Sequence, residues 1–219
     1  AEADHAVGAG GVLGPIVLRL VDRRGKHVVG VDVEPELCLA PPDGSAAAAG
    51  SAGASALGGE IAEVTWQRNA DGAALAAALS LRLWGAAGEH TVWIRDATGS
   101  AETPVALRVR LVAGRPDAAS CRVDDLGEFL GPLVAGAPRS ITVTCRDAFG
   151  NRAEEFAEVG DAVELELTPT PPAAAPTVRA RAASLGGGAH RLAFHVARAG
   201  EYAVRLTVNG AAIPLGPSG

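Results

Sequence analysis

The chain has 219 residues, which is enough for two domains of about 100 residues each. Charged residues make up 20% of the chain and the formal net charge is −6, which argues against nucleic acid as a partner, because nucleic-acid-binding domains present a basic patch. No apolar run reaches the roughly 18 residues that a membrane span requires, so we expect no membrane span within this segment. The chain also contains no methionine, even at position 1, and we expect it to be a segment of a longer protein.

Apolar residues recur at every second position in several runs, which is typical of strands that bury one face. Clusters of Gly, Pro, Asp and Asn separate these runs at fairly regular intervals, as in sandwiches and barrels. We therefore predict an all-β fold built from antiparallel β-sandwiches. In chain order, the alternating apolar positions are Ile16/Leu18/Leu20, Leu79/Leu81/Leu83, Ile141/Val143/Cys145, Val163/Leu165/Leu167, Leu192/Phe194/Val196 and Tyr202/Val204/Leu206/Val208.

Two motifs occur once in each half of the chain and indicate an internal repeat. The sequences DRRG at 22–25 and DAFG at 147–150 each follow a predicted strand, with Asp and Gly at the positions that a type I turn favours. Further along, AGEHTV at 87–92 resembles AGEYAV at 199–204. We therefore expect two domains with the same order of strands.

The boundary between the two predicted domains lies near residues 113–116, where strand character stops. We expect a first domain over residues 1–113 and a second over residues 114–219. The two motifs lie farther apart in the first half, and the low-complexity stretch at 43–55 can supply the additional residues. Small residues without periodicity bury little surface, so we predict an Ala/Gly/Ser-rich loop insertion at about 42–59.

Residues 116–217 resemble the filamin-type immunoglobulin repeat through five separated motifs in the same order. The motifs are CRV at 121–123, AGAPRSITVTCRDAFGN at 135–151, GGAHRLAF at 187–194, AGEYAV at 199–204 and IPLGP at 213–217. Residues 1–113 match more loosely, with His90 at the Tyr202 position, and are either a diverged filamin repeat or another immunoglobulin-like domain. The resemblance implies two tandem immunoglobulin-like antiparallel β-sandwiches, with Tyr202 in a tyrosine-corner type of hydrogen bond.

The resemblance also implies a way of binding. In filamin-type repeats, a partner peptide adds a strand beside strands C and D, so that main-chain hydrogen bonds supply affinity and alternate side chains supply specificity. By analogy, strand C covers about residues 162–169 and strand D about residues 176–183. We therefore expect other proteins as partners, docked by strand addition at this edge.

Four charged residues form the outward side of this predicted edge. Glu164 and Glu166 lie on strand C, and Arg179 and Arg181 lie on strand D, where an antiparallel pair brings them together as cross-strand ion pairs. They make either a charged docking edge for a partner or a solvated face that protects an edge strand from aggregation.

Two further pairs of residues each allow two interpretations. Trp84 and Trp93 sit opposite the apolar faces of their strands, so they are either exposed anchors for a partner or buried against a loop or a neighbouring domain. Cys121 and Cys145 fall on strands A and B, which pair in the fold that the resemblance implies. They form either a disulfide, which requires an oxidising compartment, or two reduced and buried thiols.

Motifs for catalysis are absent from the sequence, which contains no nucleophile elbow, no phosphate-loop lysine and no zinc-binding His-Glu-x-x-His. His190 and His195 are five positions apart on a predicted strand, so they point to opposite faces and cannot hold one metal ion from there. We therefore expect no enzymatic activity, no cofactor and no metal.

Our first functional hypothesis is a non-catalytic scaffold segment of a larger protein, of cytoskeletal or ciliary type, located in the cytoplasm or cytoskeleton. Such a segment docks partners at strand edges and spaces neighbouring domains. The acidic charge and the absence of Asn-x-Ser/Thr sequons favour it. The alternative is an ectodomain segment of a gamete or cell-surface adhesion protein, and a third hypothesis is the substrate-binding part of a ubiquitin ligase.

Overall fold

The computed structural model describes most of the chain as strands. The described residues are 5–19, 21–22, 24, 26, 28, 34–39, 57–68, 70, 74–98, 104–124, 126–153, 162–171 and 175–216. The chain divides into two compact units, Ala1–Val112 and Ala113–Gly219, which we call unit 1 and unit 2. Among the described residues the only helix is α1 (Leu126–Phe129), which confirms the predicted all-β fold class.

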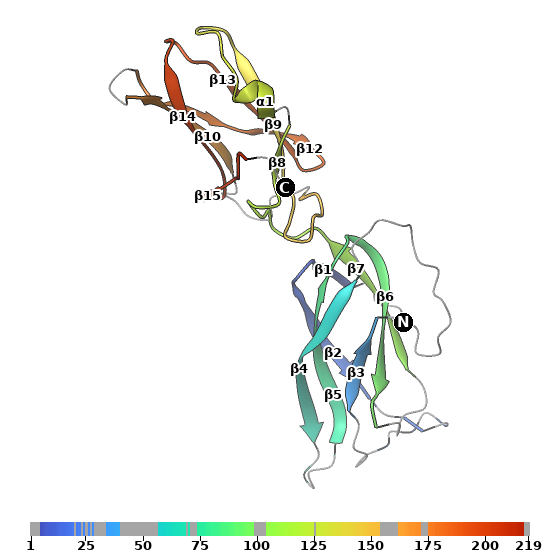
Figure 1. The fold of residues 1–219 in the computed structure, drawn as a ribbon. Helices are drawn as coiled ribbons and strands as arrows, with labels where there is room; N and C mark the ends of the chain where they lie inside the picture. The colour runs from blue at the N-terminus through green and yellow to red at the C-terminus, as the bar shows by residue number, and fades with distance from the viewer. Residues whose placement is uncertain are drawn as a thin grey trace. The chain divides into compact units, whose positions relative to one another are not determined.

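Unit 1 is a sandwich of two sheets (Figure 1). One sheet has the strand order β1-β7-β6-β3 and the other has the order β2-β5-β4. Neighbouring strands run antiparallel, except that β1 and β7 run parallel. The strands are β1 (His5–Gly8), β2 (Val12–Leu18), β3 (Pro35–Cys38), β4 (Gly58–Arg68), β5 (Ala74–Trp84), β6 (Gly88–Asp96) and β7 (Val105–Val112).

The core of unit 1 lies between these two sheets and follows the predicted alternation. Leu79, Leu81 and Leu83 of β5 are each 0% exposed. They pack in one cluster with Val92 and Ile94 of β6 from the facing sheet. In the first predicted run Ile16 is buried and Leu18 is partly buried, and residue 20 lies outside the described residues.

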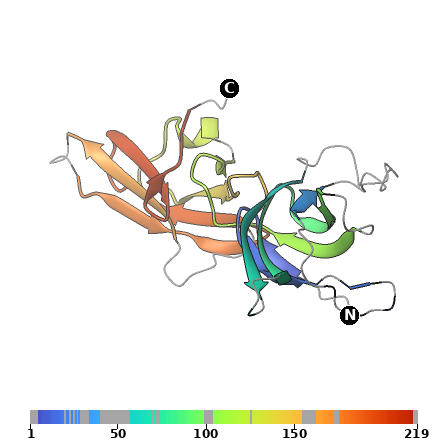
Figure 2. The same ribbon diagram turned by 90° about the horizontal axis from the view of Figure 1, so that it is seen from below.

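Unit 2 is a second sandwich, with sheets ordered β12-β13-β9-β8 and β11-β10-β14-β15 (Figure 2). With β11 and β12 taken as two halves of the fourth strand, the first, second and fifth strands form one sheet with β12. The third, sixth and seventh strands form the other sheet with β11, which apart from this split is the immunoglobulin arrangement. The strands are β8 (Arg122–Val123), β9 (Arg139–Thr144), β10 (Val163–Thr170), β11 (Val178–Arg181), β12 (Ala183–Gly186), β13 (Ala189–Phe194), β14 (Glu201–Val208) and β15 (Ala211–Ala212).

Both sheets of unit 2 contribute alternate residues to its core. Val143 and Leu192 of one sheet are 0% exposed, and Leu165 and Leu206 of the other are 1% exposed. All four belong to one cluster of buried side chains. The alternation predicted for β9, β10 and β13 is therefore confirmed, whereas at the end of β14 Thr207 is buried together with Leu206 and Val208. The alternation fixes which side of each strand faces solvent, and so where charged side chains gather.

The predicted loop insertion at about 42–59 is wrong at its end, because β4 already begins at Gly58. Gly58 lies opposite Trp84 in the β4–β5 register. A Cβ atom at Gly58 would overlap the indole of Trp84, so the ring lies directly on this glycine. A glycine that looks like loop in the sequence therefore provides space for a ring in the sheet. Residues 42–56 of the predicted insertion lie outside the described residues.

Candidate functional site

The candidate site lies on the outer face of the β10–β11 pair in unit 2. β10 turns Val163, Leu165 and Leu167 into the core, so the intervening Glu164 and Glu166 face outward.

The antiparallel register then sets Glu164 opposite Arg181 and Glu166 opposite Arg179. The structure thus brings together all four charged residues that the sequence predicted at this edge.

Each glutamate forms an ion pair with the arginine across from it. The Glu166 Oε1–Arg179 Nη2 distance is 3.0 Å, and the Glu164 Oε1–Arg181 Nε distance is 3.6 Å. The arginine side chains are 79% and 71% exposed, so each pair contributes at most about 1 kcal/mol to stability. These pairs orient the guanidinium groups at the surface and contribute little to holding the fold together.

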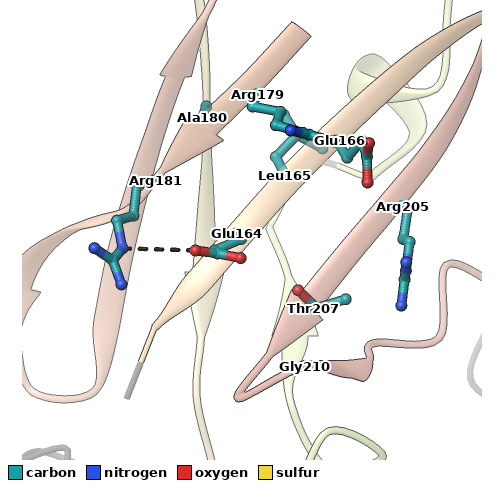
Figure 3. Close-up of a pocket in the computed structure, with 9 residues that line it drawn as sticks. All are labelled: Glu164, Leu165, Glu166, Arg179, Ala180, Arg181, Arg205, Thr207 and Gly210. Carbon is teal, nitrogen blue, oxygen red and sulfur yellow. Dashed lines mark hydrogen bonds and ion pairs between the residues drawn. The ribbon is translucent and has the colours of Figure 1, made fainter. Parts of the chain in front are cut away.

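A hollow of about 320 Å³ lies beside these pairs (Figure 3). On its other side β14 places Thr207 opposite Glu164 and Arg205 opposite Glu166. The hollow therefore has three arginines and two glutamates in its lining, together with the main chain near Gly210. Arg205 was not among the predicted site residues. Its outward position in the alternating pattern of β14, the strand that pairs with strand C, could have indicated it.

The sheet edge next to this hollow crosses from one sheet of unit 2 to the other. β11 ends the sheet that contains β10, and after Ala182 the chain continues as β12, which ends the facing sheet. The N–H of Ala182 donates to the carbonyl of Val163 over 3.0 Å, which fixes the crossing point. Within the described part of the chain, no strand pairs with the outer side of β11 or β12. We call residues 178–186 the β11–β12 edge.

The β12 half of this edge is unusually unprotected. Its four residues are all exposed and uncharged, and the Leu185 side chain is 57% exposed. Edge strands usually carry charge, proline or irregular pairing that discourages another strand from joining. Among the described residues of β12, the one feature of this kind is a register shift between Ser184 and Gly186 in its pairing with β13.

The position of strand C, which is β10, does not match the expectation that a partner strand lies beside it. β10 is an inner strand, flanked by β11 and β14, so its main chain is already paired over residues 164–167 on the β11 side. The predicted strand D is split into β11 and β12. A partner strand can therefore join at strand D, whereas joining β10 along residues 164–167 would require β11 to leave.

The structure does not bring Trp84 and Trp93 together. Both are half-buried, between the two alternatives that the sequence left open. Trp84 follows Leu83 on β5, and Trp93 follows Val92 on β6. Since Leu83 and Val92 face the core, both tryptophans point outward, from two different sheets of the sandwich. The Trp84 ring covers Gly58, so one of its faces is already occupied. The two rings cannot serve as one binding patch.

Cys121 and Cys145 lie next to each other in unit 2 and are not bonded. Their side chains are 5% and 0% exposed. The hydrogen bond from the Cys145 thiol lowers the pKa of Cys121 to about 7, and the contact with Cys121 together with burial raises the pKa of Cys145. The third cysteine, Cys38, is unbonded and half-buried in unit 1.

His190 lies in β13 and His195 directly follows this strand. The two side chains lie on opposite faces, as predicted. His190 is 4% exposed and His195 is exposed. Burial lowers the pKa of His190. Across the described residues no group of three or more His, Cys, Asp or Glu side chains is arranged to hold a metal ion. In the same part of the chain no helix combines the length and the apolar character of a membrane-crossing segment.

One predicted hydrogen bond is present in both units. The Tyr202 hydroxyl donates to the carbonyl of Arg198 over 3.0 Å, as the tyrosine-corner resemblance implied. In unit 1 the His90 Nε2 lies 2.8 Å from the carbonyl of Ala86, again four residues upstream. His90 therefore occupies the place of Tyr202, which confirms the prediction from the AGE motifs.

No family model matches the chain, and no curated protein matches it. Among solved structures, the Lin-41 filamin domain is 20% identical with a TM-score of 0.38, over 46% of this chain and 88% of that one. Invasin, a bacterial integrin-binding protein, is 15% identical with a TM-score of 0.35, over 98% of this chain and 36% of that one. Surface layer protein SbsC, domains 4-9, is 13% identical with a TM-score of 0.31, over 97% of this chain and 29% of that one.

These likenesses are similarities of immunoglobulin-like folds. The chain spans only 36% of the invasin chain and 29% of the SbsC chain. At such identities and TM-scores they add nothing to the assignment of the fold, which rests on the strand order within each unit.

Proposed function

We propose that this chain is a non-catalytic protein-binding segment whose unit 2 docks an extended, acidic stretch of a partner along the β11–β12 edge. The observation that carries the proposal is this edge itself, which ends both sheets of unit 2 and is exposed throughout its β12 half. A partner strand that joins a sheet edge gains main-chain hydrogen bonds with little dependence on sequence. Specificity then has to come from the side chains beside the edge.

The charge beside the edge favours an acidic partner. Arg179 and Arg181 are more exposed than the glutamates they pair with, at 79% and 71% against 32% and 58%. Arg205 adds a third guanidinium to the same hollow, but it lies on β14, beyond β10 and away from this edge. A carboxylate on a docked strand can therefore contact Arg179 and Arg181 from the solvent side, and such contacts act mainly on specificity and on the association rate.

The apolar contribution comes from the other half of the edge. Leu185 projects from β12 with 57% of its surface exposed, and Ala183 and Ser184 beside it are small. A partner that pairs with β12 can cover this leucine with an apolar side chain at an alternate position. The expected ligand is thus a strand with acidic residues toward β11 and an apolar residue toward β12.

The test is a titration of the isotope-labelled chain with a ten-residue Glu-Val repeat peptide, followed by NMR. We expect the largest shifts at residues 178–186. The double variant Arg179→Glu/Arg181→Glu should weaken binding roughly tenfold, because two attractive contacts become repulsive. Leu185→Asp should also weaken binding, because it removes the apolar contact and places a negative charge beside an acidic partner.

Arg139→Glu is the matched control, since Arg139 is exposed on the inner strand β9 of the same unit. It reverses one charge away from the edge, where the double variant reverses two beside it, and should leave binding unchanged. Equal binding of a Lys-Val repeat peptide would refute the acidic preference. Shifts confined to other strands, or no shift with either peptide, would refute docking at this edge.

A second setting for the same activity is favoured by one observation. Cys121 and Cys145 are buried and adjacent, and a disulfide between them would suit a protein exposed to oxidising conditions, as in the ectodomain of an adhesion protein. The scaffold and the adhesion hypotheses share the docking edge and differ in compartment. Non-reducing mass spectrometry of the chain from its natural source separates them, because a native bond favours the cell surface and two free thiols favour the cytoplasm.

A further inference from the structure

The strand register places Cys121 and Cys145 directly opposite each other. β8 and β9 pair antiparallel with Arg122 opposite Thr144 and Val123 opposite Val143. Continuing this ladder by one position brings Cys121 opposite Cys145. Residues that face each other across an antiparallel pair point to the same side of the sheet, so both thiols point into the core where the two cysteines are buried.

The hydrogen bonds show which kind of pair the cysteines form. The N–H of Asp124 donates to the carbonyl of Thr142 over 2.9 Å, and hydrogen-bonded pairs alternate along such a ladder. The cysteine pair is therefore a non-hydrogen-bonded one, and accordingly the N–H of Cys145 points away to the carbonyl of Gly188. In such pairs the Cα atoms are about 4.5 Å apart, which lies inside the range that a disulfide spans.

We propose that Cys121 and Cys145 are a built disulfide site, which closes the loop of residues 121–145 when the chain meets a small-molecule or protein disulfide. The register carries this proposal, and the burial of both thiols in one cluster agrees with it. The lowered pKa of Cys121 also favours its thiolate, the form that attacks a disulfide.

The reaction balances as two thiol–disulfide exchanges. The Cys121 thiolate attacks one sulfur of oxidised glutathione, forms a mixed disulfide and releases one glutathione thiolate. The Cys145 thiol loses its proton and displaces the second glutathione as the Cys121–Cys145 bond forms. The two protein thiols are oxidised by two electrons, and oxidised glutathione is reduced to two molecules of glutathione.

The bond would reinforce the weakest pairing of its sheet. β8 has only two residues and lies at the edge of the sheet next to β9. Without a covalent link, β8 is held by a short ladder and by the side chains that face the core. Closing the loop lowers the conformational entropy of the unfolded chain, so unit 2 should become more stable in the oxidised form.

The test uses the full chain carrying Cys38→Ala, so that only the pair can react. The chain is refolded from guanidinium in buffers of graded oxidised-to-reduced glutathione, which removes burial as an obstacle to the oxidant. Free thiols are then alkylated after unfolding and counted by mass spectrometry, with calorimetry alongside. We expect both thiols to be lost together with a peptide-mapped Cys121–Cys145 bond, and a Tm for unit 2 higher by roughly 10 °C.

The variants Cys121→Ala and Cys145→Ala in the same background serve as controls and should show no oxidation-dependent change in Tm. Two alkylated thiols after refolding in fully oxidised glutathione would overturn the proposal, and so would glutathione left on each cysteine without a bond between them. A bond that forms but lowers the Tm would also overturn it, because the site would then not be built for the bond. The peptide titrations with the β11–β12 edge are independent of each of these outcomes.

Discussion

The two units make the same turn after their second strand in opposite surroundings. In unit 1, the Asp22 carboxylate accepts the N–H groups of Arg24 and Lys26 at 2.8 and 2.9 Å, and the turn is exposed. The main-chain N–H of Asp22 donates to the carbonyl of Lys26 over 2.8 Å, which closes the turn. Water can replace every one of these partners.

In unit 2, Asp147 makes the same contacts while only 1% exposed. Its carboxylate accepts the N–H groups of Phe149 and Asn151, each at 2.9 Å, and also the N–H of Gly114 at 2.8 Å. The Asp147 carboxylate thus joins the turn to the first residues of unit 2. The contribution of such a turn to stability therefore depends less on its geometry than on whether water can replace its hydrogen-bond partners when they are lost.

Replacing the two aspartates tests this difference and should give the largest effect. We expect Asp147→Ala to lower the free energy of unfolding of unit 2 by about 2–3 kcal/mol, because it leaves several partly buried N–H groups without their acceptor. Asp22→Ala should cost unit 1 less than about 1 kcal/mol, because water reaches its donors. Urea unfolding of each variant measures both. Equal costs would show that burial does not govern this turn.

A glycine at the start of β6 and one just before β14 test where the units are alike. Gly88 has a φ of 150° and Gly200 has a φ of 156°, a backbone conformation that residues other than glycine rarely adopt. A Cβ atom at Gly88 would meet only the His90 ring at 3.9 Å, and one at Gly200 would meet nothing within 4 Å. Since the cost is then one of backbone conformation, Gly88→Ala and Gly200→Ala should each destabilise their unit by about 1–2 kcal/mol. A large difference in urea unfolding would contradict the likeness.

A pH titration should separate the units by a smaller effect. Burial lowers the pKa of His190 below its ordinary value of 6.5. The unfolded chain therefore binds the proton more readily, so this contribution to the stability of unit 2 is present above pH 6.5. It is lost as the pH falls from there through the lowered pKa.

Chemical denaturation between pH 7.5 and pH 5 measures this loss. The variant His190→Leu should remove its share of the pH dependence while the carboxylates continue to contribute theirs. An unchanged slope in the variant would show that His190 does not titrate differently in the folded and unfolded states.

The smallest effect concerns the glutamate of β3 in unit 1. Glu36 accepts a hydrogen bond from Arg95 Nε at 2.7 Å, and this bond lowers the pKa of Glu36. NMR titration should show that Arg95→Gln returns the Glu36 pKa toward its ordinary value, with little change in stability because both groups are exposed. An unchanged pKa in the variant would remove the assigned cause.

Local patterns were enough to predict the strands and their charged faces. The alternation of Glu164 and Glu166 with core residues, and the matching pattern of Arg179 and Arg181, predicted the ion pairs with their partners. The AGE motifs predicted that His90 replaces Tyr202. These succeed because burial has a period of two residues along a strand and because each contact lies within a few residues or one hairpin.

Features that depend on distant segments were not predicted. That β11 pairs with β10 and then leaves for the other sheet depends on a bend at Ala182, which has no sequence signature. The start of β4 at Gly58 depends on the indole of Trp84, a partner on another strand. The Gly114–Asp147 bond joins two segments that no motif connects. Periodicity shows which face of a strand is buried and leaves open which neighbour covers it.

The parallel pairing of β1 with β7 affects how unit 1 responds to tension. His5 to Gly8 lie beside Val109 to Val112 in the same direction, so the chain enters at the start of one strand and leaves at the end of its neighbour. A pull on the two ends of the unit slides one strand along the other. The four paired positions are then loaded in shear together, and none of them can be unzipped ahead of the next.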